Sequence, residues 1–237
     1  DKIDIKGLSS NSKKIKKDFI FFAIRGHRFN GEKYIKEAIN NGAVVVICSK
    51  KCKYVSKKAI IIKTSNIRFL LSEISSKFYK LKPKNIIAVT GTNGKTSVAD
   101  LFYQILNLNS VPVASIGTLG IKYKNKIIKS NLTSPDTIFL HKSLETIKKN
   151  KINNVILETS SHGLHQKRVN HINFKAGIFT NFSQDHLDYH KTMRSYLNCK
   201  LILFNQLLKK KNKVISNKSV TEFNTIKKIS KKRKLGL

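Results

Sequence analysis

The segment IIAVTGTNGKTS (residues 86–97) constrains the fold more than any other, because an apolar run passes directly into a glycine-rich loop and then into a helix-forming sequence. Glycines let backbone N–H groups approach phosphate oxygens, and a helix N-terminus favours negative charge. Val89 stands where the general GxxxxGK[ST] pattern has its first glycine, so the segment predicts a shortened phosphate loop. A chance glycine-rich turn is the alternative, and the flanking strand and helix argue against it.

The residue types in this loop are those that hold a nucleoside triphosphate. Lys95 offers a point charge to the β- and γ-phosphates, and Thr96 offers a hydroxyl to Mg²⁺. We therefore expect ATP and Mg²⁺ as cofactors. The residues expected to bind them are Gly91, Thr92, Asn93, Gly94, Lys95, Thr96 and Ser97.

Apolar strands alternate with amphipathic helices along the whole chain. In the first part, the patterns predict strands at 19–24, 44–48 and 59–62 and helices at 32–41 and 67–79. The stretch 81–85 carries Pro83 and no periodicity, which predicts a linker. Beyond it, the patterns predict strands at 86–90, 113–116, 155–158, 177–180 and 214–216 and helices at 97–106, 137–149 and 192–208.

This order predicts an α/β chain of two domains. A small α/β N-terminal domain (residues 1–82) is followed by a doubly wound, mostly parallel-sheet P-loop ATPase domain (residues 84–237). In such sheets, ligands bind at the carboxyl ends of the strands. The polar motifs of the second domain fall at those ends, so we expect one site there.

The net charge of +34 raises a different function class, nucleic-acid binding, because lysines that neutralise phosphates release counterions. The lysines are spread along the chain, however, and aromatic residues do not interleave with them. We therefore expect a solvated lysine surface and no nucleic-acid partner. No apolar run reaches membrane-spanning length, and three cysteines without a CxxC pair fit a reducing compartment. These features favour a cytoplasmic protein without membrane insertion.

Polar side chains follow the strand predicted at 155–158, in ILETSSHGLHQKRV. Glu158 ends that strand, where a carboxylate would face bound phosphates across the top of the sheet; an ordinary surface glutamate is the competing interpretation. Ser160, Gln166 and Arg168 supply donors suited to an anionic substrate. Arg168 can bind a carboxylate or a phosphate through two parallel hydrogen bonds, and a solvated charge is its alternative.

Two histidines, His186 and His190, lie four residues apart in FTNFSQDHLDYH. The residues between them lack the glutamate of the HExxH pattern, so this spacing does not predict a zinc site. A histidine at a strand end can instead bind Mg²⁺ beside the ATP phosphates, which is our expectation for His186. For His190, a structural role within the fold is the competing interpretation.

The chain resembles the central domain of the Mur ligases through motifs that occur in the same order: GTNGKTS, LTSPDT, LETSSHGLHQKRV, FTNFSQDHLDYHKTM and YLNCKLILF. Within that family it is most similar to the MurE type, which adds the third peptide residue to a UDP-N-acetylmuramoyl-dipeptide. The stretch SNSKKIKKDFIFFAIRGHRFNGEKYIKEAINNGA resembles the uridine-binding domain of the same group. The resemblance extends from Ser9 to about Phe204.

The resemblance implies roles for individual residues around the nucleotide. Lys95 and Thr96 match the phosphate-binding lysine and the Mg²⁺ hydroxyl. Lys200 matches a lysine that family members carry as a carbamate (an N6-carboxylated lysine), which exchanges a positive for a negative charge and makes the side chain a metal ligand. The implied metal ligands are Thr96, Glu158, His186 and Lys200. The implied catalytic residues are Lys95, His186 and Lys200.

The resemblance also implies the substrate contacts. Uridine-contacting positions are matched by Ser12 and the turn of His27, Arg28 and Phe29. Asn11 and Lys13 replace the Asp and Arg usual in the family, a departure that bears on uridine recognition. The positions that hold the muramoyl-dipeptide are matched by Thr133, Ser134, Ser160, Gln166 and Arg168.

The function implied by the resemblance is ATP-dependent amide-bond formation in peptidoglycan precursor synthesis. An amino acid, diaminopimelate or lysine, is joined to UDP-MurNAc-L-Ala-D-Glu through an acyl-phosphate intermediate. Family members continue into a C-terminal domain that binds the amino acid, and this sequence stops before it, so we expect residues 1–237 to be inactive alone. We also expect a monomer. Two alternatives stay open: a non-catalytic module that binds nucleotide-sugar and ATP, and another superfamily ligase such as a folylpolyglutamate synthase, against which the N-terminal stretch argues.

Overall fold

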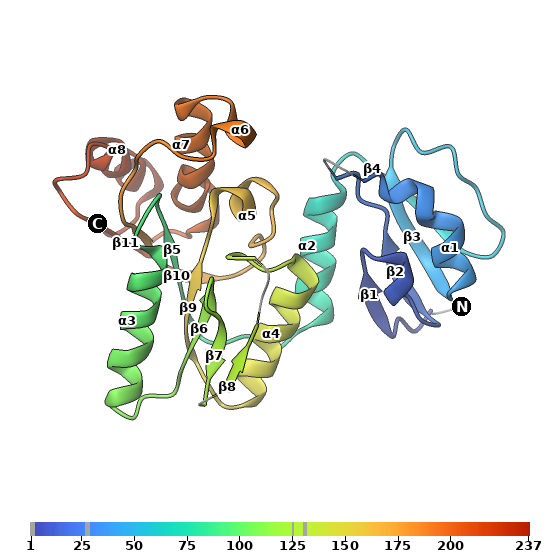
Figure 1. Cartoon of the computed structure of the whole chain (residues 1–237), viewed down its shortest axis with the longest axis horizontal. Coiled ribbons are helices and arrows are strands. Elements are labelled where there is room, and N and C mark those ends of the chain that lie inside the picture. The colour runs from blue at the N-terminus through green and yellow to red at the C-terminus, as the bar shows by residue number, and fades with distance from the viewer. Residues whose placement is uncertain (1–2, 27–28, 125, 130–131) are drawn as a thin grey trace. The chain divides into compact units, whose positions relative to one another are not determined.

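The computed structural model describes residues 3–26, 29–124, 126–129 and 132–237, and its contacts divide the chain into two compact units, Asp1–Ser75 and Ser76–Leu237 (Figure 1). The division falls inside helix α2 (Ile67–Phe78), whereas a linker was expected at residues 81–85. The last turn of α2 belongs to the second unit, where Ser76 Oγ donates to the carbonyl oxygen of His171 at 3.2 Å. The expected limits of the two domains therefore differ from the observed division.

In the described part of the first unit, parallel strands pair in the order β1-β2-β3-β4. Alternate residues of a strand point to opposite faces, and Phe21 and Val46 pack with Ile35 and Ala38 of helix α1 into one core. The elements are β1 (Gly7–Ser9), the 3₁₀ turn η1 (Ser12–Lys14), β2 (Phe19–Phe22), η2 (Gly31–Tyr34), α1 (Ile35–Asn40), β3 (Ala43–Ser49), β4 (Ile60–Thr64) and the start of α2.

In the described part of the second unit, one larger sheet has the strand order β11-β10-β5-β9-β6-β7-β8. The pairs from β11 to β6 are parallel, and β7 and β8 extend the sheet antiparallel. Its strands are β5 (Asn85–Thr90), β6 (Val113–Gly117), β7 (Gly120–Tyr123), β8 (Lys126–Ile128), β9 (Asn154–Glu158), β10 (Phe174–Phe179) and β11 (Lys213–Ser216). The expected α/β class with a mostly parallel sheet is confirmed, and the antiparallel β7–β8 hairpin was not expected.

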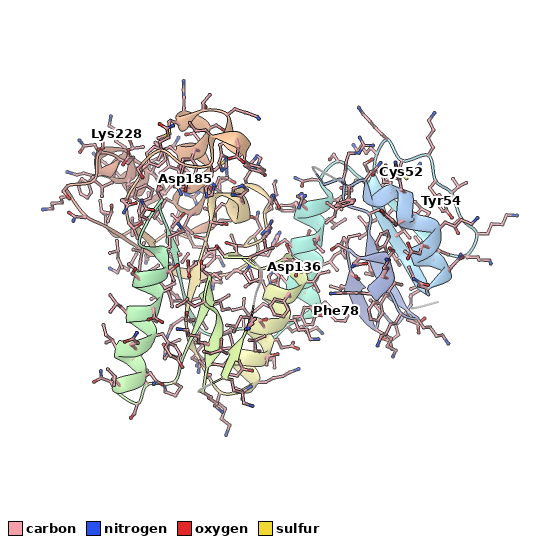
Figure 2. All side chains as sticks on the ribbon, viewed as in Figure 1. Cys52, Tyr54, Phe78, Asp136, Asp185 and Lys228 are labelled. Atoms are coloured by element: carbon pink, nitrogen blue, oxygen red, sulfur yellow. The ribbon has the colours of Figure 1, made fainter. Side chains whose placement is uncertain are left out.

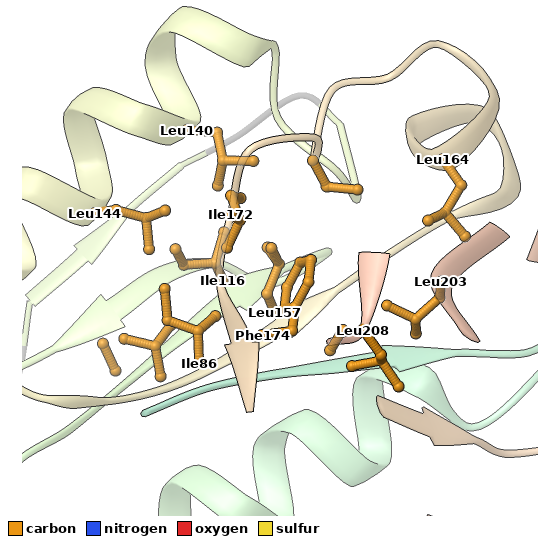
Figure 3. Close-up of a cluster of buried hydrophobic side chains, with 14 of the residues drawn as sticks. Ile86, Ile116, Leu140, Leu144, Leu157, Leu164, Ile172, Phe174, Leu203 and Leu208 are labelled. Atoms are coloured by element: carbon orange, nitrogen blue, oxygen red, sulfur yellow. The ribbon is translucent and has the colours of Figure 1, made fainter. Parts of the chain in front are cut away.

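Helices cover both faces of this sheet. Val89 and Ile156 pack against Ala99 of α3, whereas the neighbouring residues of the same strands join the large cluster beneath α4, which Figure 3 shows with Leu140 and Leu144 above Leu157. The Asp136 side chain caps α4 by accepting the Phe139 N–H at 3.1 Å (Figure 2). The helices are α3 (Lys95–Leu108), α4 (Thr137–Lys149), α5 (Ser161–His165), α6 (Leu187–His190), α7 (Met193–Ile202), the π-helical turn η3 (Leu203–Leu207) and α8 (Phe223–Arg233).

A helix was expected at residues 192–208, but the regular α-helix α7 ends at Ile202. Beyond it the backbone widens into the π-helical turn η3. The wide turn keeps Leu203 and Phe204 inside the core, where Phe204 packs 6.1 Å from Phe179 between ring centroids. None of the helices formed by the described residues combines the length and the apolar character that crossing a bilayer requires.

His141, on α4, is fully buried, and burial lowers its pKa to about 3. The unfolded chain takes up this proton near pH 6.5, so it binds more protons than the folded chain between about pH 6.5 and about pH 3. We expect the free energy of unfolding to fall with decreasing pH in that window, by at most about 1.4 kcal/mol per pH unit from this group.

The variant His141→Leu should reduce that slope in urea unfolding measured from pH 7 to pH 4. Some slope should remain, because burial also lowers the pKa of His190, to about 4. Equal slopes for the variant and the parent chain would show that His141 is not buried in its neutral form.

Candidate functional site

The phosphate loop, defined here as Gly91–Gly94, joins the end of β5 to the start of α3. Gly91 and Gly94 have φ angles of +146° and +78°, which residues with a side chain rarely adopt. An added Cβ at Gly91 would also lie 1.9 Å from Thr180 Oγ1. The loop thus brings the N-terminus of α3, with Lys95 and Thr96 in its first turn, to the carboxyl edge of the sheet, where the helix dipole favours an anion.

Lys95 folds back over this loop. Its Nζ donates to the carbonyl oxygens of Gly91 at 3.1 Å and Thr92 at 2.6 Å. Burial lowers the pKa of Lys95, and the negative charges of Glu158 and Asp185 oppose that change. A phosphate would offer this ammonium charged acceptors in place of neutral ones, which makes stronger hydrogen bonds.

Glu158, at the end of β9, is 1% exposed and holds its carboxylate beside Thr96. Oε2 accepts from Thr96 Oγ1 at 2.9 Å and from Thr118 Oγ1 at 3.2 Å, while Oε1 accepts the Thr118 N–H at 2.9 Å. Gly117 leaves room for this carboxylate, because a Cβ there would lie 1.9 Å from Oε1. A carboxylate and a hydroxyl at one position are the oxygen donors that Mg²⁺ prefers.

Lys200, on α7, is the second cation at the loop. It is 1% exposed, and its Nζ donates to the Gly91 carbonyl at 2.6 Å and lies 4.2 Å from the centre of the Tyr196 ring. Burial and the nearby charge of Lys95 lower the pKa of Lys200 to about 7. Lys95 and Lys200 therefore share one carbonyl acceptor, and the described structure records no carboxylate bonded to either.

Histidines gather beside this region. His186 forms the N-cap of α6, with its ring 4.9 Å from the His162 ring between centroids and its Nε2 3.4 Å from Asp185 Oδ2 (Figure 2). His190 is buried, and its Nε2 lies 2.9 Å from Ser161 Oγ, which fits a structural histidine. Among the residues that the structure describes, no three His, Cys, Asp or Glu side chains surround one metal position. Magnesium binding by Thr96, Glu158, His186 and Lys200 stays a prediction.

The residues expected to hold the dipeptide lie together. Ser134 Oγ donates to the main-chain oxygen of Glu158 at 3.0 Å, lies 3.1 Å from Ser160 Oγ and accepts the Ser160 N–H at 2.9 Å. Arg168 Nη1 donates to the Ser134 carbonyl at 2.8 Å, and Arg168 Nη2 donates to Gln166 Oε1 at 2.7 Å. This cluster begins at the same strand end that carries the Glu158 carboxylate.

Thr133 connects with the same network, since its Oγ1 lies 3.1 Å from Thr118 Oγ1. Thr118 in turn donates to Glu158. The expected nucleotide and dipeptide residues of the second unit are thus linked through Glu158.

In the first unit, a cavity of about 530 Å³ is lined by Ser12, Phe29 and Tyr34 together with Ser10, Asn11, Lys13, Phe21, Ile24 and Gly31. Ser12 is buried, and its Oγ donates to Glu37 Oε2 at 3.1 Å. Asn11 caps the following turn through its side-chain oxygen, which accepts the Lys13 N–H at 3.0 Å. His27 and Arg28, also expected at the uridine site, lie outside the described residues.

Several residues that contact these groups or the phosphate loop were not expected from the sequence: Gly117, Thr118, Thr180, Asn181, Ser183 and Tyr196. Thr180, Asn181 and Ser183 belong to FTNFSQDH, in which the pattern pointed only to the histidine. The available signal was a polar run directly after an apolar strand, which in a parallel sheet reaches the ligand-binding edge.

Comparison with known proteins adds a second line of evidence. The model of the Mur ligase middle domain matches residues 89–236, and that of the Mur ligase family catalytic domain matches residues 4–79. A similar curated relative is the UDP-N-acetylmuramoyl-L-alanyl-D-glutamate–2,6-diaminopimelate ligase of Wigglesworthia glossinidia brevipalpis, 43% identical over 96% of this chain and 47% of its own length. The chain spans about half the length of the curated relatives it matches.

Solved structures agree with these matches. A structure of a UDP-N-acetylmuramoyl-L-alanyl-D-glutamate–2,6-diaminopimelate ligase has a TM-score of 0.82 and 28% identity, covering 98% of this chain and 47% of that one. The MurF ligase of Thermotoga maritima, solved in complex with ADP, shares the fold at a TM-score of 0.62 and 18% identity, covering 97% of this chain and 48% of that one. Because the middle-domain model alone matches more than half of the sequence, the chain belongs to the Mur ligase family.

Proposed function

We propose that this chain forms the precursor-binding and ATP-binding parts of a ligase that joins an amino acid to UDP-N-acetylmuramoyl-L-alanyl-D-glutamate. One observation carries the proposal: Glu158 contacts both the residues expected to bind the nucleotide and those expected to hold the dipeptide. Its carboxylate accepts from Thr96 at the phosphate loop, while its main-chain oxygen accepts from Ser134 of the dipeptide cluster. A substrate carboxylate held by that cluster would lie close to the terminal phosphate of ATP.

The proposed reaction has two steps. A carboxylate oxygen of the precursor attacks the γ-phosphorus of ATP, and the bond to the bridging oxygen breaks to release ADP. The amine of the incoming amino acid then attacks the acyl carbon, loses a proton and displaces phosphate. Such phosphoryl transfer needs little covalent help from the protein, which contributes positioning and charge neutralisation.

Each group in the site has a task in this scheme. Lys95 exchanges the loop carbonyls for phosphate oxygens, and Arg168, already at the dipeptide cluster, orients an anionic end of the precursor. Thr96 and Glu158 would hold Mg²⁺, which neutralises phosphate charge when bound. We add His186 and a carbamylated Lys200 as further ligands, since an uncharged or anionic group at these positions would not repel the metal.

The relatives' names favour diaminopimelate over lysine as the added amino acid. Because these relatives are about twice as long, we propose that residues 1–237 alone bind substrates without turnover. Reactants that are nucleotides and nucleotide-linked precursors favour an enzyme that works in the cytoplasm.

Replacing Lys95 by alanine should weaken binding of ATP–Mg²⁺ by roughly ten- to a hundred-fold, because one charged donor to the phosphates is lost. Isothermal titration calorimetry on the 237-residue chain measures this directly. Lys84→Ala, an exposed lysine just before β5, is the matched control and should bind as the parent does. Unchanged affinity in Lys95→Ala would contradict the proposed role of the loop.

Lys200 should capture CO₂ more readily than other lysines. Its neutral amine attacks the carbon of CO₂ and releases a proton. A pKa of about 7 leaves about half of Lys200 neutral at pH 7, against roughly four in ten thousand for an ordinary lysine. With ¹³C-bicarbonate, the parent chain should show a carbamate carbon signal that strengthens as the pH rises through 7. Lys200→Ala should lose that signal and Lys84→Ala should keep it; a signal that persists without Lys200 would refute the assignment.

The cavity of the first unit should bind the uridine end of the precursor, with Phe29 stacking on the base. Phe29 is 71% exposed although it lines the cavity, as expected of a side chain that awaits a planar ligand. Titration with UDP should shift the amide signals of residues 10–13 and 29–34, and Phe29→Ala should weaken binding roughly tenfold. Phe69→Ala, on α2, is the control; shifts confined to residues 84–237 would exclude a uridine site in this cavity.

A further inference from the structure

A short segment after β10 holds the phosphate loop from the side. We call Thr180, Asn181 and Ser183 the brace. The Thr92 N–H donates to the main-chain oxygen of Asn181 at 2.9 Å, and the Asn93 N–H donates to Asn181 Oδ1 at 2.9 Å. Thr180 Oγ1 donates to the Asn93 carbonyl at 2.7 Å. The brace therefore binds two backbone N–H groups and one carbonyl oxygen at the tip of the loop.

Thr92 is held at its side chain as well. The Ser183 N–H donates to Thr92 Oγ1 at 3.1 Å, and Thr92 Oγ1 lies 3.2 Å from the Ser183 carbonyl, to which it donates. Tyr196, on α7, adds a longer contact from its hydroxyl to Thr92 Oγ1 at 3.4 Å. Thr92 is consequently buried although it belongs to a loop at the edge of the sheet.

The brace reaches the loop because of the strand pairing. Phe179 of β10 lies opposite Thr90 of β5 in the parallel register, so the two chains leave the sheet side by side. Gly91 permits the close approach, since a Cβ there would meet Thr180 Oγ1 at 1.9 Å. A glycine-rich loop without such contacts samples many backbone conformations, and ordering it would reduce the affinity for a ligand.

We propose that Thr180 and Asn181 are positioning residues that hold the phosphate loop in its phosphate-binding shape before the nucleotide arrives. They act on the loop through hydrogen bonds to Asn93 and do not contact the reacting groups. The inference rests on the proposed function in one respect, that the loop binds ATP–Mg²⁺. The geometry of the brace is independent of that function.

Two substitutions at Thr180 distinguish the contribution of its hydroxyl to ATP–Mg²⁺ binding from the contribution of its side-chain shape. Thr180→Val keeps the branched shape and loses the donor to Asn93, so ATP–Mg²⁺ should bind roughly five-fold more weakly by calorimetry. Thr180→Ser keeps the hydroxyl and should restore binding to within about two-fold of the parent chain. A purely structural role would lower the thermal midpoint without this difference in affinity between Val and Ser.

Asn181→Ala removes the side-chain acceptor of the Asn93 N–H and keeps the main-chain oxygen that receives the Thr92 N–H. Without nucleotide, hydrogen exchange of the Asn93 amide should become faster by roughly five-fold or more, and ATP–Mg²⁺ affinity should fall as in Thr180→Val. The matched control is Asn85→Ala, which removes a side-chain contact to Asn154 of 3.0 Å at the opposite end of β5. It should change neither measurement.

The two measurements distinguish failure of the brace from failure of the proposed function. A parent chain that does not bind ATP–Mg²⁺ refutes the nucleotide assignment, and the exchange rate of Asn93 then decides alone whether the brace orders the loop. If the parent chain binds and Thr180→Val and Asn181→Ala bind equally well, the positioning role is overturned. Unchanged exchange of Asn93 in Asn181→Ala would overturn it too.

Discussion

The site depends on one constraint, the parallel pairing of β5 with both β9 and β10. Parallel neighbours end at the same edge, so the phosphate loop, the Glu158 carboxylate and the brace emerge together although they are far apart in the sequence. An antiparallel neighbour would send one of these ends to the opposite edge. The second unit keeps its antiparallel strands, β7 and β8, at the far side of the sheet, where they do not interrupt this arrangement.

Two kinds of buried charge result from this geometry. Glu158 accepts three hydrogen bonds from Thr96 and Thr118. The Lys200 ammonium is buried against the neutral Gly91 carbonyl and the Tyr196 ring. Neither contact fully replaces the hydration that the ammonium loses on burial, so the pKa of Lys200 falls. Lys200 therefore changes protonation state near neutral pH.

Much of this fold could be predicted from local patterns, since apolar runs of strand length and the glycine-rich loop are visible in a single sequence. The strands of the central sheet and helix α4 agree with such patterns. The β7–β8 hairpin could not be predicted, because strands of four and three residues are too short to show a clear period. Only the pairing of β7 with β6, and of β8 with β7, identifies them as strands. The end of α7 at Ile202 was missed for a related reason: the π-helical turn is favoured by core packing of Leu203 and Phe204.

For the candidate site, the sequence points to residues whose type carries its own chemistry, such as Lys95 and Glu158, and their binding roles stay predictions. Residues that act on other residues were missed, because a threonine such as Thr118 or Thr180 has no distinctive signal until its hydrogen-bond partner is known. The π-helical turn and the brace were missed for the same reason, because both depend on contacts between segments that are distant in the sequence.

Gly117 and Glu158 illustrate what such dependence means for variation in this chain. The glycine is required by the carboxylate that fills the space of its missing side chain. A larger residue at 117 is tolerable only with a shorter one at 158, and a shorter carboxylate would withdraw from Thr96. A substitution at residue 117 would therefore act on Thr96 through the displaced Glu158 carboxylate.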